Sequence, residues 1–490
     1  MSNQNQTPLI DALKAAIARH HAPFYTPGHK HGAGISSTLT DLLGQEVFRA
    51  DLTELAELDH LFTPQSAILA AQELAAAAFG AEKTWFLVNG STCGIEAAIL
   101  ATCGMGDKII LPRNVHSSVI SGLILSGAIP IFIHPIYNSD LDIAHSITPT
   151  ALKTALSQHP DAKAVLVVYP TYYGVCGDLR AIAELTHQYN IPLIVDEAHG
   201  AHFAFHPDLP TSALTSSADL TVQSIHKTLG AMTQASMLHI QGKRINIDRL
   251  NQALQLVQST SPSFILLASL DAARQQMAIN GEKLMFQTLQ LAEAARMQIS
   301  QIPGLSVLQI PQNYINNSNN GFVDLDTTRL TVNISELGFT GFEAEDLLNE
   351  MGVTPEFSSL QNLTFIISLG NNKTHIDALV QSLQNLSQIP QLTSQYKKCK
   401  YRNDDMISGN MCISPREAFF AHSEILPLEE TEAKICAEIV CPYPPGIPVL
   451  MPGEIITKPA IEYLQQIHSL GGCISGCMDS SLRNLKVIKT

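Results

Sequence analysis

Basic residues are scarce in this chain. Its 490 residues include 29 lysines and arginines against 44 aspartates and glutamates, which gives a formal net charge of −15. Nucleic-acid phosphates are bound by basic surfaces, so this balance argues against nucleic acid as a main partner. The same charge is compatible with a cationic substrate, although net charge governs encounter rates more than it defines sites.

Long apolar runs and a leader segment are also lacking. The run "FILLASL", residues 264–270, is far shorter than the ~20 residues that span a bilayer. The opening "MSNQNQTPLIDALKAAI" has no basic stretch followed by an apolar one, so we expect no signal peptide, no membrane partner and a cytoplasmic location.

Cysteine usage excludes a disulfide framework. Nine cysteines are an odd number spread over a long chain, so we expect reduced thiols. Cys473 and Cys477 lie four residues apart, but no second pair lies nearby, and we expect no metal site there.

Helices and strands alternate from about residue 65 onward. The patterns predict helices at 66–80, 94–104 and 180–190, and strands at 84–88, 107–111, 129–133, 164–168 and 191–196. Short, continuously apolar strands between helices are typical of a mostly parallel sheet covered on both faces. The sequence therefore predicts an α/β fold.

The length suggests roughly two to four domains. We expect an N-terminal arm at 1–60 that contains the loop "FYTPGHKHGAG", and a large cofactor-binding domain at 61–310. An Asn-rich loop at 309–322 leads into a smaller α/β domain at 311–393. A charged linker at 394–406 opens the last domain, 394–490. No internal repeat is visible.

An anion-binding loop is predicted after the first strand, in "NGSTCGIEAA". Gly90 allows a close approach of the backbone, and Ser91 and Thr92 offer hydroxyls and free N–H groups where a helix begins. Taken alone, this pattern is more typical of a plain helix N-cap. It is not a G-x-S-x-G nucleophile motif, because Thr92 occupies the central place.

Asp196 follows the apolar run "PLIV" and should lie at a strand end with little solvent. A buried carboxylate must be paired, by a helix cap, an ion or a ligand. A metal site is an alternative, because His199, His202 and His206 follow at helical spacing. The aromatic residues and prolines of "HFAFHPDLP" argue against a continued helix there.

Ser224, His226 and Lys227 in "QSIHKTLG" come about thirty residues after Asp196. An anion cup, a buried carboxylate and a lysine beside small polar residues are what pyridoxal 5'-phosphate requires. The lysine forms the Schiff base, the aspartate pairs with the protonated ring nitrogen and the cup holds the phosphate. His116, in "PRNVHSS" at another strand end, could stack on the pyridine ring, or bind a backbone carbonyl of its loop.

The motifs together resemble the bacterial ornithine/lysine/arginine decarboxylase family of pyridoxal phosphate fold type I. The resemblance covers nearly the whole chain, and the motifs occur in the family's order. It is strongest to the shorter branch without an N-terminal wing, and within it to biosynthetic arginine decarboxylases. The matching segments are "TPGHKHG", "LVNGST", "PRNVHSS", "VDEAHGAHF", "QSIHKTLG", "SPSFILLASLDAAR" and "YPPGIPVLMPGE".

This resemblance implies a role for individual residues. Lys227 matches the Schiff-base lysine, Asp196 the ring-nitrogen partner and His116 the stacking histidine. The remaining matches are phosphate ligands and a histidine near the cofactor, at Ser91, Thr92, Ser224, His226 and His199. Glu454 resembles an acidic residue near the distal end of the substrate, and its alternative is a rim carboxylate.

The resemblance also implies an activity and an assembly. We expect decarboxylation of a basic amino acid, arginine to agmatine first, with lysine or ornithine as alternatives. We also expect a homodimer or higher homo-oligomer in which Thr260–Ser263 reach the partner's site. An aminotransferase or aldol-type lyase, with Arg416 or Arg329 on the α-carboxylate, is a further alternative, as is a non-catalytic regulator.

Overall fold

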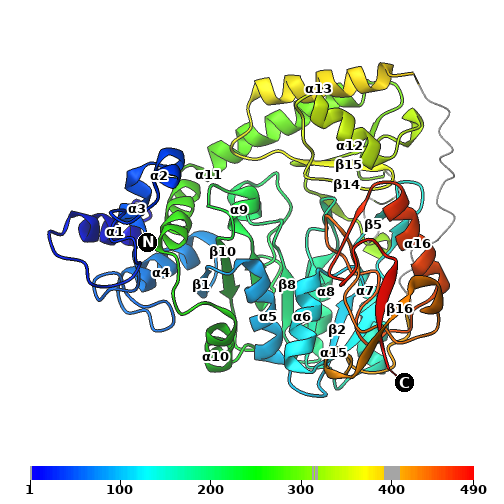
Figure 1. Cartoon of the computed structure of the whole chain (residues 1–490), viewed down its shortest axis with the longest axis horizontal. Coiled ribbons are helices and arrows are strands. Elements are labelled where there is room, and N and C mark those ends of the chain that lie inside the picture. Colours follow the sequence, from blue (N-terminus) through cyan, green and yellow to red (C-terminus); the bar gives the residue numbers. More distant parts are fainter. Residues whose placement is uncertain (1–2, 312–313, 315–317, 391–408, 490) are drawn as a thin grey trace. The chain divides into compact units, whose positions relative to one another are not determined.

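A computed structural model describes residues 3–311, 314, 318–390 and 409–489 of the chain (Figure 1). The predicted linker at 394–406 and part of the Asn-rich loop lie outside the described residues. The chain forms two compact units, each built from two separate segments. Unit 1 comprises Met1–Ala101 and Val195–Met285, and unit 2 comprises Thr102–Ile194 and Phe286–Thr490.

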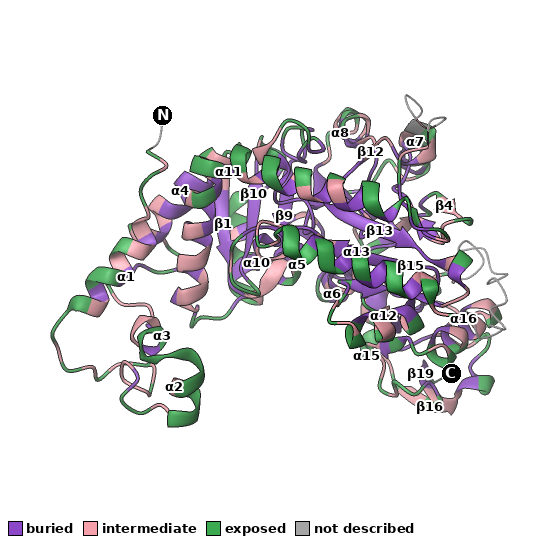
Figure 2. Cartoon of the chain, turned by 90° about the horizontal axis from the view of Figure 1, so that it is seen from above, coloured by how far each residue is buried: buried purple, intermediate pink, exposed green. Residues whose placement is uncertain are grey.

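The sheet of unit 1 contains one reversed strand. β10 (Ser236–Ile240) lies between β1 (Lys83–Leu87) and β9 (Leu220–Gln223) and runs antiparallel to both. β8 (Leu193–Asp196) enters the unit at its carboxyl end and contacts β9 through the Glu197 N–H to Val222 O hydrogen bond, 2.9 Å long. Figure 2 shows the strands of this unit as buried.

The sequence predicts two helices of unit 1: α4 (Ala67–Phe79) lies within one residue of the predicted bounds 66–80, and α5 (Gly90–Thr102) begins four residues before the predicted 94–104. α4 stops at Gly80, which has the left-handed φ of 76°. α5 packs closely on the sheet, because a Cβ at Gly94 would lie 2.7 Å from Leu87 and 2.8 Å from Val222. The other helices are α1 (Pro8–Ala18), α2 (Ser37–Leu43), α3 (Gln45–Ala50), η1 (Phe203–Phe205), α9 (Ile225–Thr228), α10 (Ile247–Val257) and the long α11 (Phe264–Ile299).

The predicted N-terminal arm contains three helices that were not predicted from the sequence: α1, α2 and α3. Two residues of α11, Asp271 and Arg274, form a buried ion pair with each other and bind the backbone of the N-terminal segment. Asp271 accepts the Leu9 N–H at 3.0 Å, and Arg274 donates to the Gln4 carbonyl at 2.9 Å. The segment "FYTPGHKHGAG" forms turns, as predicted.

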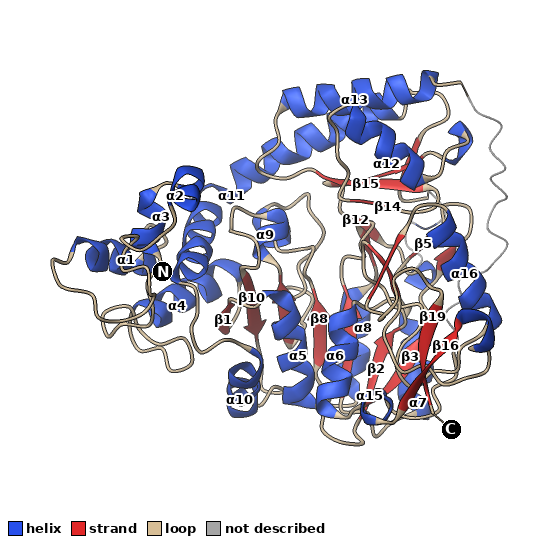
Figure 3. Ribbon diagram, viewed as in Figure 1, coloured by secondary structure: helices blue, strands red, loops and turns tan. Residues whose placement is uncertain are grey.

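The larger sheet of unit 2 is parallel. β2 (Lys108–Pro112) pairs with both β3 (Ile129–Ile133) and β6 (Ala164–Val168). Three helices alternate with these strands: α6 (Ser117–Ser126), α7 (Pro149–Gln158) and α8 (Leu179–Gln188) (Figure 3). Of the three, the sequence predicts α8, at 180–190.

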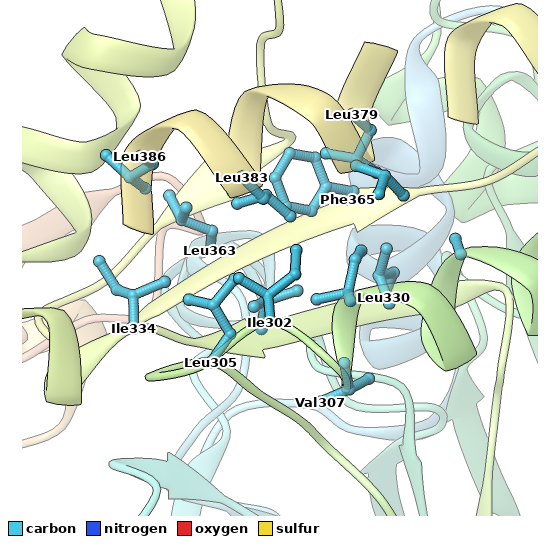
Figure 4. Packing of buried hydrophobic residues seen from close by; sticks show 14 of the residues in the cluster. Ile302, Leu305, Val307, Leu330, Ile334, Leu363, Phe365, Leu379, Leu383 and Leu386 are labelled. Atoms are coloured by element: carbon cyan, nitrogen blue, oxygen red, sulfur yellow. The ribbon is translucent and has the colours of Figure 1, made fainter. Parts of the chain in front are cut away.

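A smaller antiparallel sheet forms a second core in unit 2. Its order is β11 (Ser306–Val307), β13 (Arg329–Asn333), β15 (Asn362–Ile366) and β14 (Phe357–Ser358). α12 (Gly341–Glu350) and α13 (Lys373–Gln388) cover it. Leu330, Leu363 and Phe365 from the strands meet Leu379 and Leu383 of α13 in this core (Figure 4).

The C-terminal residues form two ribbons and two helices. β16 (Ser423–Pro427) pairs with β19 (Asn484–Ile488), and β17 (Cys441–Tyr443) with β18 (Cys473–Ser475). The helices are α15 (Pro415–Phe420) and α16 (Lys458–Ser469). The remaining short elements of unit 2 are β4 (Tyr137–Asn138), β5 (Ile143–Ala144), β7 (Val175–Cys176), β12 (Asp324–Leu325), η3 (Ser318–Asn320), η4 (Ser335–Leu337) and η5 (Leu428–Glu430).

None of the helices in the described part of the chain combines the length and apolar character that a bilayer crossing needs. The cysteines in these residues are free thiols, as expected.

Candidate active site

The predicted anion-binding loop lies where β1 passes into α5. Gly90 has a φ of 76°, a left-handed conformation that glycine adopts without strain, and it is the first residue of α5. Ser91 and Thr92 follow in the first turn, where helical N–H groups have no partner within the helix. The start of this 13-residue helix therefore offers N–H groups and two hydroxyls to an anion.

Ser224 joins this loop from a distant part of the sequence. Its hydroxyl donates to Ser91 Oγ at 2.7 Å, although the two residues are 133 positions apart. Ser224 is buried directly after β9 and precedes the short helix α9. The structure thus brings together two of the residues predicted to bind phosphate.

Asp196 ends β8 and is buried, as predicted. Its Oδ1 accepts the Ala198 N–H at 3.2 Å. Burial raises the pKa of this carboxyl, while the Lys227 charge and the Ala198 hydrogen bond act in the opposite direction. A carboxylate in this position is stabilised by a cation placed against it.

Lys227 lies in α9 and meets a histidine from the β8 side. Its Nζ is 3.1 Å from His199 Nε2, and His199 is buried. Asp196, His199 and Lys227 therefore form one cluster in unit 1. His226, the neighbour of Lys227, is held by its own loop, with Nδ1 3.0 Å from the Ala235 carbonyl.

The chain neighbours of Asp196 and Ser224 belong to a buried polar network that was not predicted from the sequence. Glu197 accepts the Ala213 N–H at 2.7 Å and the Gln223 side-chain amide at 2.8 Å. Gln223 Oε1 lies 3.1 Å from His239 Nε2, and His239 Nδ1 lies 2.8 Å from Thr84 Oγ1. The network links β1, β8, β9 and β10 directly behind Asp196 and Ser224.

Burial dominates the protonation of this network. It raises the pKa of Glu197 to about 8 and lowers the pKa of His239 to about 3. Both side chains are therefore neutral near pH 7. The signal that could have found Glu197 is its place beside Asp196, directly after a wholly apolar strand.

The segment Thr260–Ser263 is anchored next to the anion-binding loop. Gln258 Oε1 accepts the Val88 N–H at 3.0 Å, and the Ser259 N–H donates to Asn89 Oδ1 at 3.2 Å. Thr260 and Ser261 are exposed. The predicted reach of this segment into a partner subunit stays a prediction.

His116 caps α6 in unit 2. Its Nδ1 accepts the Ser118 N–H at 3.1 Å and lies 2.9 Å from Ser118 Oγ. The ring is half-buried beside Gly446, whose carbonyl accepts the Ser117 N–H at 3.3 Å. The stacking role of His116 stays a prediction, and the structure adds a cap that fixes the ring.

Glu454 is fully buried in unit 2 and paired with Arg113. The Arg113 guanidinium is 3.0 Å from Glu454 Oε2 and also donates to the Pro448 and Val449 carbonyls, at 2.7 and 3.1 Å. Burial raises the pKa of Glu454 to about 7, and the Arg113 charge limits the rise. The pair fixes the proline-rich loop, and the substrate contact predicted for Glu454 stays a prediction.

The two arginines considered for an aminotransferase also lie in unit 2. Arg416 donates to the Ile124 and Leu125 carbonyls, at 2.9 and 3.1 Å, near the end of α6. Arg329 is buried on β13.

The histidines after Asp196 do not assemble a metal site. Within the described ranges, no three His, Cys, Asp or Glu side chains are grouped closely enough to hold a metal ion. η1 follows His202 instead of a continued α-helix.

Two family models match successive segments of the chain. The family model described as Orn/Lys/Arg decarboxylase, major domain, matches residues 7–375, and the model of the C-terminal domain matches 401–476. The arginine decarboxylase of Bacillus subtilis is 40% identical over 491 residues, which cover 99% of this chain and 99% of that protein. The arginine decarboxylase of Halalkalibacterium halodurans is 40% identical over 100% of this chain and 99% of that protein.

A solved structure shares the fold. The lysine decarboxylase LdcF of Francisella novicida superposes with a TM-score of 0.85 at 24% identity, over 99% of this chain and 81% of that one. This likeness, together with the mixed, mostly parallel sheet, confirms the predicted α/β fold of pyridoxal phosphate fold type I.

Proposed function

Because this chain belongs to the Orn/Lys/Arg decarboxylase family, we propose that it decarboxylates a basic amino acid, L-arginine to agmatine and CO₂, with pyridoxal 5'-phosphate. The observation on which this rests is the cluster of Lys227, His199 and buried Asp196 beside the Ser91–Ser224 pair. Arginine is favoured over lysine because arginine decarboxylases share 40% identity with this chain, whereas lysine decarboxylases share 24–25%.

The residues of unit 1 fit this cofactor. Asp196 is a buried carboxylate that a protonated ring nitrogen would stabilise. The start of α5, with Ser91, Thr92 and Ser224, would hold the phosphate. Lys227 would bind the carbonyl carbon, and His226 is a further residue of unit 1 proposed to surround the cofactor. When bound, the cofactor would supply the electron sink for the electron pair that remains on Cα when CO₂ leaves.

Lys227 and His199 are close enough to exchange a proton. At 3.1 Å the two nitrogens share a hydrogen bond, so one of them must accept while the other donates. Lys227 has to be neutral to act as a nucleophile, and His199 is a hydrogen-bond partner that could take its proton. Protonation of the product carbon would fall to Lys227 or His226.

The decisive experiment is a product assay. Purified protein with added cofactor is given arginine, lysine and ornithine, and CO₂ and amine are measured for each. With arginine we expect equal amounts of CO₂ and agmatine. We expect lower kcat/KM values for lysine and ornithine than for arginine. A keto acid in place of the amine would contradict decarboxylation and favour an aminotransferase.

Two variants make the assay specific to the proposed site. Lys227→Ala should release no CO₂, and borohydride reduction should label none of its remaining lysines; a label at a single other lysine would contradict the assignment. Lys243→Ala, an exposed lysine of the same unit, is the matched control and should behave as wild type.

We further propose that the protein is a homodimer, or a multiple of it, whose subunits share active sites. We also propose that it acts in the cytoplasm, in polyamine biosynthesis. The exposed Thr260 and Ser261, anchored beside the anion-binding loop, support a contact with a partner subunit. Analytical ultracentrifugation would report a monomer if the proposal is wrong.

A further inference from the structure

A cavity of about 110 Å³ lies within unit 2, and none of the residues proposed above for the cofactor lines it, although Asn114 of its wall is two positions before His116. Its walls come from the β4–β5 hairpin, the loop after β6, the start of α12, the proline-rich loop and α16. The residues that define its chemistry are Asp142, Tyr137, Tyr173, Phe342, Tyr463 and Pro445.

Asp142 is the one side chain with a formal charge among the described residues that line the cavity. The Tyr137 hydroxyl donates to its Oδ1, and no cation of the described residues forms an ion pair with it. Burial raises the pKa of Asp142 to about 6, and the Tyr137 hydrogen bond acts against the rise. A positive charge in the cavity would therefore relieve a desolvated carboxylate.

The walls are suited to a cation as well. Tyr137 and Tyr173 remain neutral phenols, because burial and then the Asp142 charge raise the pKa of both. Tyr463 and Phe342 add further rings, and the prolines add apolar surface. Aromatic faces attract ammonium and guanidinium groups, and a carboxylate beside several rings is the usual form of a cage for organic cations.

We propose that this cavity binds a small organic cation, an alkylammonium or a guanidinium, with Asp142 as its counter-ion and the tyrosine rings as its walls. Among the described lining residues the one charged side chain is acidic, which disfavours a phosphate or carboxylate ligand. The proposal goes beyond the decarboxylase reaction and does not depend on which amino acid is consumed.

Asp142 offers a clean variant and a matched control. It has a φ of 54°, a left-handed conformation that Asn tolerates as Asp does, so Asp142→Asn removes the charge with the backbone retained. Asp140 lies in the same hairpin but is exposed and does not line the cavity. Asp140→Asn therefore makes the same change of net charge outside the site.

Calorimetric titration of the cofactor-loaded protein tests the proposal. The probes are 1,4-diaminobutane for the ammonium, agmatine for the guanidinium, and 1,4-butanediol as the uncharged analogue. Wild type and Asp140→Asn should bind at least one cationic probe and should not bind the diol. Asp142→Asn should weaken that binding roughly 10- to 100-fold, as expected for loss of a buried charge partner.

A second variant and an activity measurement complete the test. Tyr463→Leu should weaken binding by a few-fold, about the contribution of one ring, with an unchanged circular dichroism spectrum. Equal binding by wild type and Asp142→Asn overturns the proposal. So does a parallel loss of kcat/KM for arginine in Asp142→Asn without added cation, because the cavity would then belong to the substrate route. An inactive wild type would refute the decarboxylase function but leave the binding result readable.

Discussion

At the scale of single residues, Asp196 is the group on which the proposed chemistry depends most. Its carboxylate is buried, and burial by itself favours the neutral acid. Lys227 is the nearby cation in the structure, and a protonated pyridine nitrogen would be a second. The buried Asp196 carboxylate is thus a negative charge that the protonated ring nitrogen of the cofactor could compensate.

Asp196→Asn should keep the fold and bind the cofactor, yet lose most of its turnover. A charge pair at ~4 Å in an effective dielectric near 20 contributes up to ~4 kcal/mol. At ~1.36 kcal/mol for each tenfold change, kcat should fall by up to about 1,000-fold. Stopped assays with arginine measure kcat, and the absorbance of bound cofactor measures occupancy. Wild-type kcat at full occupancy would exclude the electron-sink role.

The raised pKa of Glu197 predicts that the stability of the protein depends on pH. Its pKa is about 8 in the folded chain against an ordinary value of 4.5. The folded state therefore binds more protons than the unfolded state between these values. The contribution of this group is fully present below pH 4.5 and is lost as the pH rises through 8.

Glu197→Gln removes this dependence, because the neutral amide has no proton to lose. Relative to the variant, wild type should lose on the order of 2–4 kcal/mol of unfolding free energy between pH 5 and pH 8. Urea unfolding at several pH values measures the gap. Glu282→Gln, at an exposed position of α11, is the control. Parallel curves for wild type and Glu197→Gln would mean that Glu197 titrates as an ordinary carboxyl.

At the scale of elements, the proline-rich loop is held by one arginine. Arg113 binds two of its carbonyls and Glu454, so the loop after β17 is attached to the residues that follow β2. His116 is three residues beyond Arg113, and the next residue, Ser117, donates its N–H to the Gly446 carbonyl of the same loop at 3.3 Å. We therefore expect a change in this ion pair to alter the loop that lies beside the His116 ring.

Glu454→Gln separates a substrate contact from this fixing role. Breaking a buried pair leaves the Arg113 charge uncompensated and should lower stability by roughly 3–5 kcal/mol. If Glu454 also meets the distal group of arginine, kcat/KM should fall by an equivalent of roughly 2–5 kcal/mol, with the absorbance of the resting enzyme unchanged. Thermal unfolding and steady-state kinetics measure the two effects. Lower stability with unaltered kcat/KM would contradict the substrate role.

The sequence predicts elements better than it predicts long-range partners. The helix closed by Gly80 and the strand ending at Asp196 follow from local apolar patterns and a local stop signal, and both are confirmed. The Arg113–Glu454 pair spans 341 residues, and no local pattern at either residue indicates the other. The Glu197 network was missed for the same reason, because its members are polar residues within apolar strands whose neighbours are decided only by the order of the sheet.

At the scale of the whole molecule, the candidate site depends on a discontinuous unit. Unit 1 is assembled from residues 1–101 and 195–285, so the Ser91 segment and the Lys227 segment are separated in the sequence by the residues 102–194 of unit 2. The Ser91–Ser224 hydrogen bond joins the two segments of unit 1. A ligand that contacts both segments should therefore stabilise the unit as a whole.

The last prediction follows from this linkage. A cofactor that binds only the folded chain adds RT ln(1 + [L]/Kd), about 2.7 kcal/mol at 100 times Kd, so the unfolding temperature should rise with the logarithm of the pyridoxal phosphate concentration. The Ser91→Ala/Ser224→Ala variant lacks the hydroxyls proposed to hold the phosphate, and its unfolding temperature should rise far less. Ser216→Ala, which removes a buried serine elsewhere in unit 1, should respond as wild type does. Differential scanning calorimetry of the three proteins over a series of cofactor concentrations measures the slopes. If the double variant gains as much as wild type, the phosphate lies elsewhere, and the start of α5 is a plain helix N-terminus after all.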